Sequence, residues 1–437
     1  MRFLFLFFFS SFPLAVAAQS LLQSGPMNGF SDHREAALWV QTKTPAKVGF
    51  RFREMGSSAR MRQTESIVTE KKSGFTATII ADSLLPGKRY EYELLINGKL
   101  EKVDRKLEFQ TPALWMHRTD PPNFDVAVGS CTYVNEPFWD RPGKGYGDSM
   151  QIFKTIADSK PDLMLWIGDN TYTREGDWNS RGGFNHRYTH TRSLPEMQTL
   201  LSSAQNYATW DDHEFGPNDS DRSFWNKDIS AETFRNFWPM PSQPLGKGPV
   251  TSTFSWGDCQ FFMLDDRWFR APNNSSDSSR AFFGEQQIQW FLDALTYSRA
   301  NFKIVACGGQ VINDARVFEN YAVYPVERRS LLERISAAKI PGVFFLSGDR
   351  HHAELSRLER PGNYPLYDLT TSPLTSGVHN PGNEANTLRV PGTLFNGHNF
   401  AMLHFSGPAK DRVMTISLKD NRGNTAWEKQ IKASELK

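Results

Sequence analysis

The sequence predicts an α/β protein in which a small antiparallel β-sandwich precedes a larger core of strands and helices. In residues 22–112, short segments of alternating polar and apolar residues are separated by turn residues, which is typical of a β-sandwich. From residue 124 onward, wholly apolar strand segments alternate with helical segments, which indicates sheets covered on both faces. The length of 437 residues favours two domains, or one large domain with an appendage.

The first eighteen residues form a separate segment with the features of a secretory signal peptide. Arg2 supplies a positive charge, a run rich in Phe and Leu follows, and the small residues Val16, Ala17 and Ala18 end the segment. The apolar run is shorter than the roughly 20 residues that a membrane-spanning helix needs. We therefore expect cleavage before Gln19, export to the periplasm or the extracellular space, and no stable membrane insertion.

The β-sandwich is predicted over residues 19–115. Its expected strands are residues 37–41, 46–51, 74–80, 89–96 and 107–110, with turns at Pro86-Gly87 and Asn97-Gly98. Tyr90 follows a leucine and a turn at the start of a strand, as a tyrosine corner requires. The domain resembles a fibronectin type III module or the N-terminal module of purple acid phosphatases.

A linker at residues 111–123 leads into the core domain, which is predicted over residues 120–430. The expected strands are residues 124–128, 163–167, 207–210, 260–264, 302–306 and 342–346, and the expected helices are residues 148–157, 194–202, 284–296 and 326–338. Residues 395–431 return to an alternating pattern and are predicted to add edge strands. In such α/β cores, ligands bind at the carboxyl ends of the strands.

The composition excludes one class of partner and raises a question about the cysteines. Fifty basic and forty-eight acidic side chains are scattered along the chain, so no nucleic-acid-binding surface is indicated. Because there are three cysteines, Cys131, Cys259 and Cys307, at least one thiol lies outside any intramolecular disulfide. Either all three are buried and inert, or Cys131 binds a metal.

Five core strands end in loops that contain potential metal ligands. The loops are residues 129–131 (Gly-Ser-Cys), 168–172 (Gly-Asp-Asn-Thr-Tyr), 211–214 (Asp-Asp-His-Glu), 308–310 (Gly-Gly-Gln) and 348–352 (Gly-Asp-Arg-His-His). A single Asp after a strand is more often a turn former or a helix cap, but five such loops in order are hard to explain as turns. Carboxylate, phenolate, imidazole and thiolate groups together suit a hard ion alongside iron or zinc. Two such ions can clamp both oxygens of a phosphoryl displacement.

The order and content of these loops resemble the calcineurin-like metallophosphoesterases, and most closely the alkaline phosphatase D (PhoD-like) family. The motifs at residues 129–131, 210–214 (Trp-Asp-Asp-His-Glu) and 347–352 carry the resemblance, which covers nearly the whole mature chain. It implies a core of two packed β-sheets flanked by helices, and a metal-dependent hydrolase of phosphate esters.

The resemblance also implies roles for individual residues. The metal ligands it implies are Cys131, Tyr172 and His351 for a first ion, Asp212 and Asp349 for a second ion, and Asp169 as the bridge between them. By analogy the first ion is Fe3+ and the second Ca2+, with Zn2+ or Mn2+ as alternatives. His213 would act with Asp169 in catalysis, as an acid or electrostatic stabiliser near the leaving-group oxygen.

Three further loop residues have roles that the sequence leaves open. Gln310 either touches metal or substrate or merely ends a strand, Asp211 is a candidate metal or substrate contact, and His352 is expected to support a ligand rather than bind metal. The segment at residues 173–191 forms either a rim that selects substrates or a solvated insertion. Arg267 is expected to form a structural ion pair with a neighbouring Asp.

Three hypotheses of function follow. The leading one is an exported enzyme that hydrolyses phosphate monoesters, diesters or both through a metal-activated hydroxide. The second keeps the same site but favours diesters, as in a phosphodiesterase or a phospholipase D-like hydrolase. The third is a catalytically inert surface binding protein whose sandwich engages a ligand. The intact series of candidate ligands favours the enzyme, which would act on a small-molecule or polymeric phosphoester.

Overall fold

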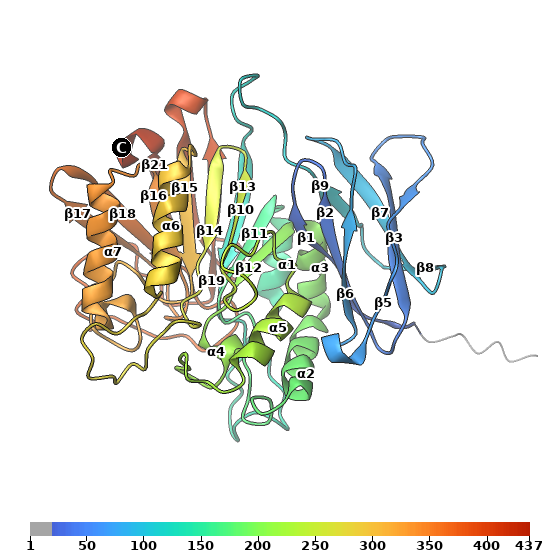
Figure 1. The fold of residues 1–437 in the computed structure, drawn as a ribbon, viewed down its shortest axis with the longest axis horizontal. Helices are drawn as coiled ribbons and strands as arrows, with labels where there is room; N and C mark the ends of the chain where they lie inside the picture. Colours follow the sequence, from blue (N-terminus) through green and yellow to red (C-terminus); the bar gives the residue numbers. More distant parts are fainter. Residues whose placement is uncertain (1–19) are drawn as a thin grey trace, which may run out of the picture.

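The computed structural model describes residues 20–437, so the predicted signal peptide lies outside the described residues. These residues form four β-sheets, two in an N-terminal sandwich and two in a core with helices (Figure 1). The predicted α/β class with an N-terminal β-sandwich is thus confirmed. None of the helices in the described part of the chain is long and apolar enough to cross a membrane.

The sandwich packs a three-stranded sheet against a six-stranded sheet. The smaller sheet contains β1 (Leu22–Ser31), β2 (Ala36–Thr42) and β6 (Thr76–Ala81), and the larger contains β3 (Lys47–Glu54), β4 (Arg62–Gln63), β5 (Ile67–Val68), β7 (Arg89–Ile96), β8 (Lys99–Glu101) and β9 (Glu108–Gln110). The hydroxyl of Tyr90 accepts a hydrogen bond from the backbone N–H of Leu85 at 2.8 Å, which is the contact expected of a tyrosine corner.

The core contains two six-stranded sheets of mixed direction. The first has the order β12 (Gln205–Thr209), β11 (Leu163–Ile167), β10 (Phe124–Gly129), β19 (Asn399–Ser406), β20 (Val413–Asp420) and β21 (Thr425–Lys432). The second has the order β13 (Ser252–Trp256), β14 (Cys259–Met263), β15 (Phe302–Cys307), β16 (Val343–Ser347), β18 (Asn363–Thr370) and β17 (Glu354–Arg360). Strands β10, β11 and β12 are parallel to one another, as are β14, β15, β16 and β18.

Both faces of the first sheet are covered, which explains its wholly apolar strands. Val126 and Val128 belong to the apolar cluster shared with the second sheet, whereas Ala127 between them belongs to a cluster with the helices. The helices are α1 (Gln151–Asp158), α2 (Arg181–Arg192), α3 (Pro195–Ser203), α4 (Asp212–Phe215), α5 (Lys227–Phe237), α6 (Glu285–Tyr297) and α7 (Pro325–Ala337). Helices α6 and α7 lie on the outer side of the second sheet (Figure 1).

The structure narrows the expectations for two segments. Of the strands expected at the sheet edge in residues 395–431, β21 is at the edge, whereas β19 is not, because it pairs with β10 on one side and β20 on the other. Residues 173–191 are not a solvated insertion, because they include most of helix α2, in which Arg187 and Tyr188 are buried. A salt bridge of 2.8 Å joins Arg187 to Asp177 within this segment.

The sandwich is fixed to the core by buried polar and aromatic contacts. The Nε1–H of Trp39 in β2 donates to the carbonyl of Asn236 at 2.7 Å, and the amide of Asn206 in β12 donates to the carbonyl of Asn28 at 2.9 Å. Met27 and Trp39 also belong to the apolar cluster that covers the first core sheet. The sandwich therefore packs on the α1–α3 side of the core (Figure 1).

Candidate metal centre

The five candidate loops follow parallel strands of the two core sheets, and the fold brings them together. The loops after β10, β11 and β12 lie at one edge of the first sheet, and those after β15 and β16 at the matching edge of the second. The N–H of Cys131 donates to the carbonyl of Gly168 at 3.2 Å, and that of Gly348 to the carbonyl of Gly308 at 2.7 Å. Backbone hydrogen bonds thus hold neighbouring loops in each sheet.

Two glycines allow the two sets of loops to approach each other. A Cβ atom added to Gly348 would lie 2.6 Å from the hydroxyl oxygen of Ser130, and one added to Gly308 would collide with the carboxylate of Asp211. Each of these contacts joins a loop of the second sheet to a loop of the first. A side chain at either position would force the ligand-bearing loops apart.

Side chains from these loops converge on one small volume. Several sets of three residues place their potential ligand atoms within 4.8 Å of one another. These sets are Cys131 with Asp169 and His351, Asp169 with Asp212 and His213, Asp169 with Asp211 and Asp349, and Asp211 with Asp212 and Glu319. Asp169 belongs to three of these four groups, which is the position a bridging ligand requires. The fourth group contains Glu319, which is not among the residues predicted from the sequence.

The phenol of Tyr172 joins the side of the cluster that holds Cys131 and His351. Its hydroxyl lies 3.1 Å from Nε2 of His351, and the sulfur of Cys131 lies 3.6 Å from a carboxylate oxygen of Asp169. The hydroxyl of Ser372 donates to the same sulfur at 3.1 Å. Sulfur, phenol and imidazole thus meet at one end of the cluster.

Four residues of the cluster have left-handed backbone conformations. The φ angles are 60° at Cys131, 52° at Asp169, 61° at Asp349 and 56° at His351. Asp and His adopt this region more readily than most other L residues, but Cys seldom does. Such conformations persist where the surrounding structure imposes them, and they concentrate at functional sites.

The electrostatics of the cluster favour a bound cation. Burial and the charge of Asp212 raise the pKa of Asp169 well above its usual range, and burial raises the pKa of Asp349 to about 7. Among the described residues, no Lys, Arg or His side chain forms a salt bridge with Asp169. Carboxylates in this arrangement need a cation to stay ionised near neutral pH, so the donor set fits a metal site.

The thiol and the two histidines of the cluster respond to burial in opposite directions. Burial raises the pKa of the Cys131 thiol to about 12, so a cation would be needed to hold it as thiolate. Burial lowers the pKa of His351 to about 3 and also lowers that of His213. Both imidazoles are therefore neutral at neutral pH, which is the form that binds a metal or donates a hydrogen bond.

A buried arginine provides a positive charge at the opposite end of the cluster. Arg267 forms ion pairs with Asp211 and Glu319, and its Nε lies 3.8 Å from a carboxylate oxygen of Asp266. The ion pair expected from the sequence, with a neighbouring Asp, is therefore present, and two further partners come from distant loops. One carboxylate oxygen of Asp211 is thus held by Arg267, while Oδ2 is buried without a hydrogen-bond partner. That oxygen is available to a ligand.

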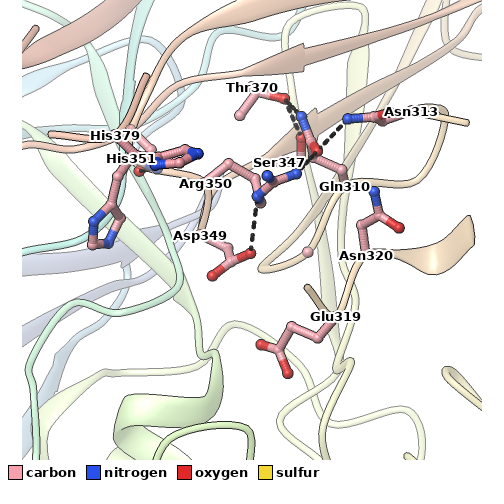
Figure 2. A network of polar contacts seen from close by, with 12 residues as sticks. Gln310, Asn313, Glu319, Asn320, Ser347, Asp349, Arg350, His351, Thr370 and His379 are labelled. Atoms are coloured by element: carbon pink, nitrogen blue, oxygen red, sulfur yellow. Dashed lines mark hydrogen bonds and ion pairs between the residues drawn. The ribbon is translucent and has the colours of Figure 1, made fainter. Parts of the chain in front are cut away.

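Gln310 is occupied by other side chains rather than free to bind a metal or substrate. Its amide nitrogen donates to Glu354 at 2.9 Å and to Thr370 at 2.8 Å, and its oxygen accepts from Arg350 and from Asn313, each at 2.7 Å. Figure 2 shows Arg350 between Gln310 and Asp349, whose carboxylate lies 3.9 Å from the guanidinium. The role of Gln310 is therefore to hold Arg350 beside Asp349.

Two other loop residues support the cluster from outside. Nδ1 of His352 lies 2.8 Å from the carbonyl oxygen of Arg350, and its Nε2 lies 3.6 Å from Glu354, so the ring is held within the second sheet's own network. The carboxylate of Glu214 accepts the backbone N–H of Asp169 at 2.9 Å and that of Asp211 at 3.1 Å. Glu214 thus ties the loop after β11 to the loop after β12.

Comparison with known proteins shows which family the chain belongs to. Residues 126–410 match the family model described as PhoD-like phosphatase, and residues 19–122 match a domain of unknown function. The chain belongs to the PhoD-like phosphatase family. This membership confirms the resemblance found in the loop motifs.

Sequence and structural relatives agree with this assignment. Alkaline phosphatase D of Bacillus subtilis (strain 168) is 21% identical over 328 residues, which cover 64% of this chain and 53% of that protein, so the match spans about half the relative's length. A solved structure of PhoD superposes with a TM-score of 0.77 at 17% identity, covering 95% of this chain and 90% of that one. Purple acid phosphatase PPD1 from yellow lupin (Lupinus luteus) seeds has a TM-score of 0.64 at 13% identity, covering 93% and 74%. These structural likenesses show a shared fold.

Proposed function

We propose that this protein is an exported metal-dependent phosphoesterase that hydrolyses phosphate monoesters, diesters or both. The observation that carries the proposal is the convergence of Cys131, Asp169, Asp212, Asp349 and His351 in overlapping groups of ligand atoms at the strand ends. Membership of the PhoD-like phosphatase family supports the same reaction. The predicted signal peptide supports action in the periplasm or outside the cell.

The donor set divides into two halves that suit different ions. The half with Cys131, Tyr172 and His351 offers sulfur, phenol and imidazole, which suit iron, and we propose Fe3+ there. The half with Asp212 and Asp349 offers carboxylate oxygen, which suits Ca2+, with Mn2+ or Zn2+ as alternatives. When bound, such ions polarise the phosphoryl group and lower the pKa of water.

The chain's own residues would then orient the substrate and stabilise charge. Asp169 is proposed to bridge the two halves. His213 stands beside this bridge, because its backbone N–H donates to Asp169 at 3.3 Å and its Nε2 lies 4.0 Å from Asp212. Since burial keeps His213 neutral, its imidazole is proposed to donate a hydrogen bond to the phosphoryl or leaving-group oxygen rather than to carry a full charge.

An exposed aromatic ring beside the cluster favours diesters as a second form of the proposal. Phe318 is 66% exposed and precedes Glu319, one of the clustered carboxylates. Arg350 lies over the same ring at 4.8 Å, which holds it in place. A diester carries a second organic group that can rest on such a surface, whereas a monoester does not.

The test compares a chromogenic phosphate monoester with its matching diester, with metal content measured on the same sample. We expect hydrolysis of at least one substrate, loss of activity on chelation, and iron plus a divalent ion by elemental analysis. As a matched pair, Cys131→Ser should lower the iron content, whereas Cys259→Ser, which alters a buried thiol between the core sheets, should not.

Protein that carries neither metal after both are supplied would contradict the two-metal assignment. Protein that binds both ions but hydrolyses neither ester would favour the inert binding protein instead. Equal iron content in the two cysteine variants would remove Cys131 from the proposed ligands.

A further inference from the structure

Tyr146 contacts the metal cluster from a loop that none of the family motifs includes. Its hydroxyl lies 3.0 Å from Nδ1 of His351. The other ring nitrogen, Nε2, lies 3.1 Å from the hydroxyl of Tyr172 and 3.3 Å from that of Ser376. The two nitrogens of His351 therefore face different ways, Nε2 toward another proposed ligand and Nδ1 toward Tyr146.

The backbone on the C-terminal side of Tyr146 is anchored to the core. The amide of Asn135 donates to the carbonyl of Gly147 at 2.7 Å, and the N–H of Gly147 donates back to Asn135 at 2.9 Å. The next residue, Asp148, donates its N–H to the carbonyl of Thr375 at 2.8 Å. These bonds fix the position of Tyr146 although it lies outside any helix or strand.

The space for the phenol ring depends on a glycine. A Cβ atom added to Gly377 would lie 2.6 Å from Cε2 of Tyr146. On another side the ring packs edge-on against Tyr133, with centroids 5.0 Å apart and an angle of 77°. The hydroxyl of Tyr133 points elsewhere and donates to Asp140 at 2.9 Å. Two adjacent tyrosines thus differ in that only Tyr146 reaches His351.

We propose that Tyr146 is a positioning residue of the metal centre, holding the His351 ring so that Nε2 faces the first ion. This inference rests on the proposed function. With Nε2 on the ion, Nδ1 carries the hydrogen and donates it to the Tyr146 hydroxyl. Loss of such a partner typically costs about 10–100-fold in metal affinity or activity. Because Tyr146 is 48% exposed, it supports His351 from the surface of the site and not from the buried interior.

The test uses full-length mature protein loaded with iron and a divalent ion and challenged with a chelator. In Tyr146→Phe, which keeps the ring and removes the hydroxyl, we expect metal affinity to fall about tenfold or more. Tyr133→Phe, the matched control, should retain metal like the wild type. Gly377→Ala, which displaces the ring, should resemble Tyr146→Phe, and the double variant should lose no more than either single variant.

Each outcome separates this inference from the proposed function. A Tyr146→Phe variant that holds metal as the wild type does, while the wild type binds metal and hydrolyses esters, overturns the inference alone. A variant that retains metal but has a raised KM also overturns it, because Tyr146 would then contact substrate. A wild type that binds no metal removes the proposed function itself. Unchanged unfolding of the metal-free Tyr146→Phe protein, together with weaker metal binding, would support a positioning role over a general loss of stability.

Discussion

Glu319 and Asp169 are both buried carboxylates of the same cluster, yet their surroundings are opposite. Burial alone would raise the pKa of Glu319, but Arg267 and Arg270 hold it well below its usual range. Burial and the charge of Asp212 instead raise the pKa of Asp169 well above its usual range. Glu319 therefore has its own cations, whereas Asp169 forms no salt bridge with a cationic side chain in the described part of the chain.

This difference separates the supporting part of the cluster from the part proposed to bind metal. Arginine cannot lose its charge in a protein, so Arg267 is a permanent counter-charge beside Asp211 and Glu319, although burial still raises the pKa of Asp211 well above its usual range. Around Asp169, a dissociable cation would supply the same neutralisation and could also contact a substrate.

Removing the internal cation should destabilise the fold. Arg267→Met leaves Asp211 and Glu319 buried without their partner, and breaking such a pair typically costs about 3–5 kcal/mol of the free energy of unfolding. Denaturant titration of the metal-free protein measures the change. The control is Arg334→Met, which breaks the more exposed pair with Glu285 and should cost less than about 1 kcal/mol. Equal losses in the two variants would refute the contrast.

Replacing the proposed bridging carboxylate at the other end should abolish function without lowering stability. In Asp169→Asn, we expect turnover to fall by more than about 100-fold, beyond the loss of a residue that only supports a ligand. The free energy of unfolding of the metal-free protein should not decrease, because burial and the charge of Asp212 already disfavour an ionised Asp169, and Asn is neutral and tolerates the positive φ at this position. Wild-type-like turnover, or a large loss of stability, would contradict the proposed bridge.

The metal-free protein should also lose stability as the pH rises from about 6.5 to about 8. Burial raises the pKa of Glu214 to about 8 and that of Asp349 to about 7, so the folded state holds protons that the unfolded state has already released. The decrease is at most about 1.4 kcal/mol per pH unit for each group. Below about pH 6.5, the lowered pKa of His351 acts in the opposite direction.

Denaturant titrations at several pH values, with and without metal, measure this effect. Metal-loaded protein should show a flatter profile over the same range, because bound cations keep the carboxylates ionised. Stability of the metal-free protein that rises between pH 6.5 and 8 would show that the acidic cluster is already neutralised by other means.

The ligand-bearing loops could be predicted because each is a local pattern. Asp169 and Asp349 directly follow apolar strands, and parallel strands bring their carboxyl ends to one edge of a sheet. Glu319 has no such signal, because it lies in a long irregular segment between β15 and α7. Its place beside Arg267 depends on how that segment returns to the sheet edge.

Helix α2 was not predicted from the sequence, for a different physical reason. Its buried side chains include Arg187 and Arg192, so the helical periodicity of apolar residues, which would predict a helix, is weak. Arg192 packs its guanidinium over Trp238 at 3.7 Å, a contact between distant parts of the chain. A buried arginine stabilised by tertiary contacts looks, in sequence, like a residue of a solvated loop.

The sequence by itself determined the fold class and most of the candidate ligands, because hydrophobic patterning and strand-end loops are local properties. Only the tertiary structure decided which carboxylates have an internal cation and which do not, since Arg267, Asp211 and Glu319 are far apart in the chain. It also placed Tyr146 against His351, 205 residues away. Electrostatic balance in a buried site depends on distances between charges, and those exist only after folding.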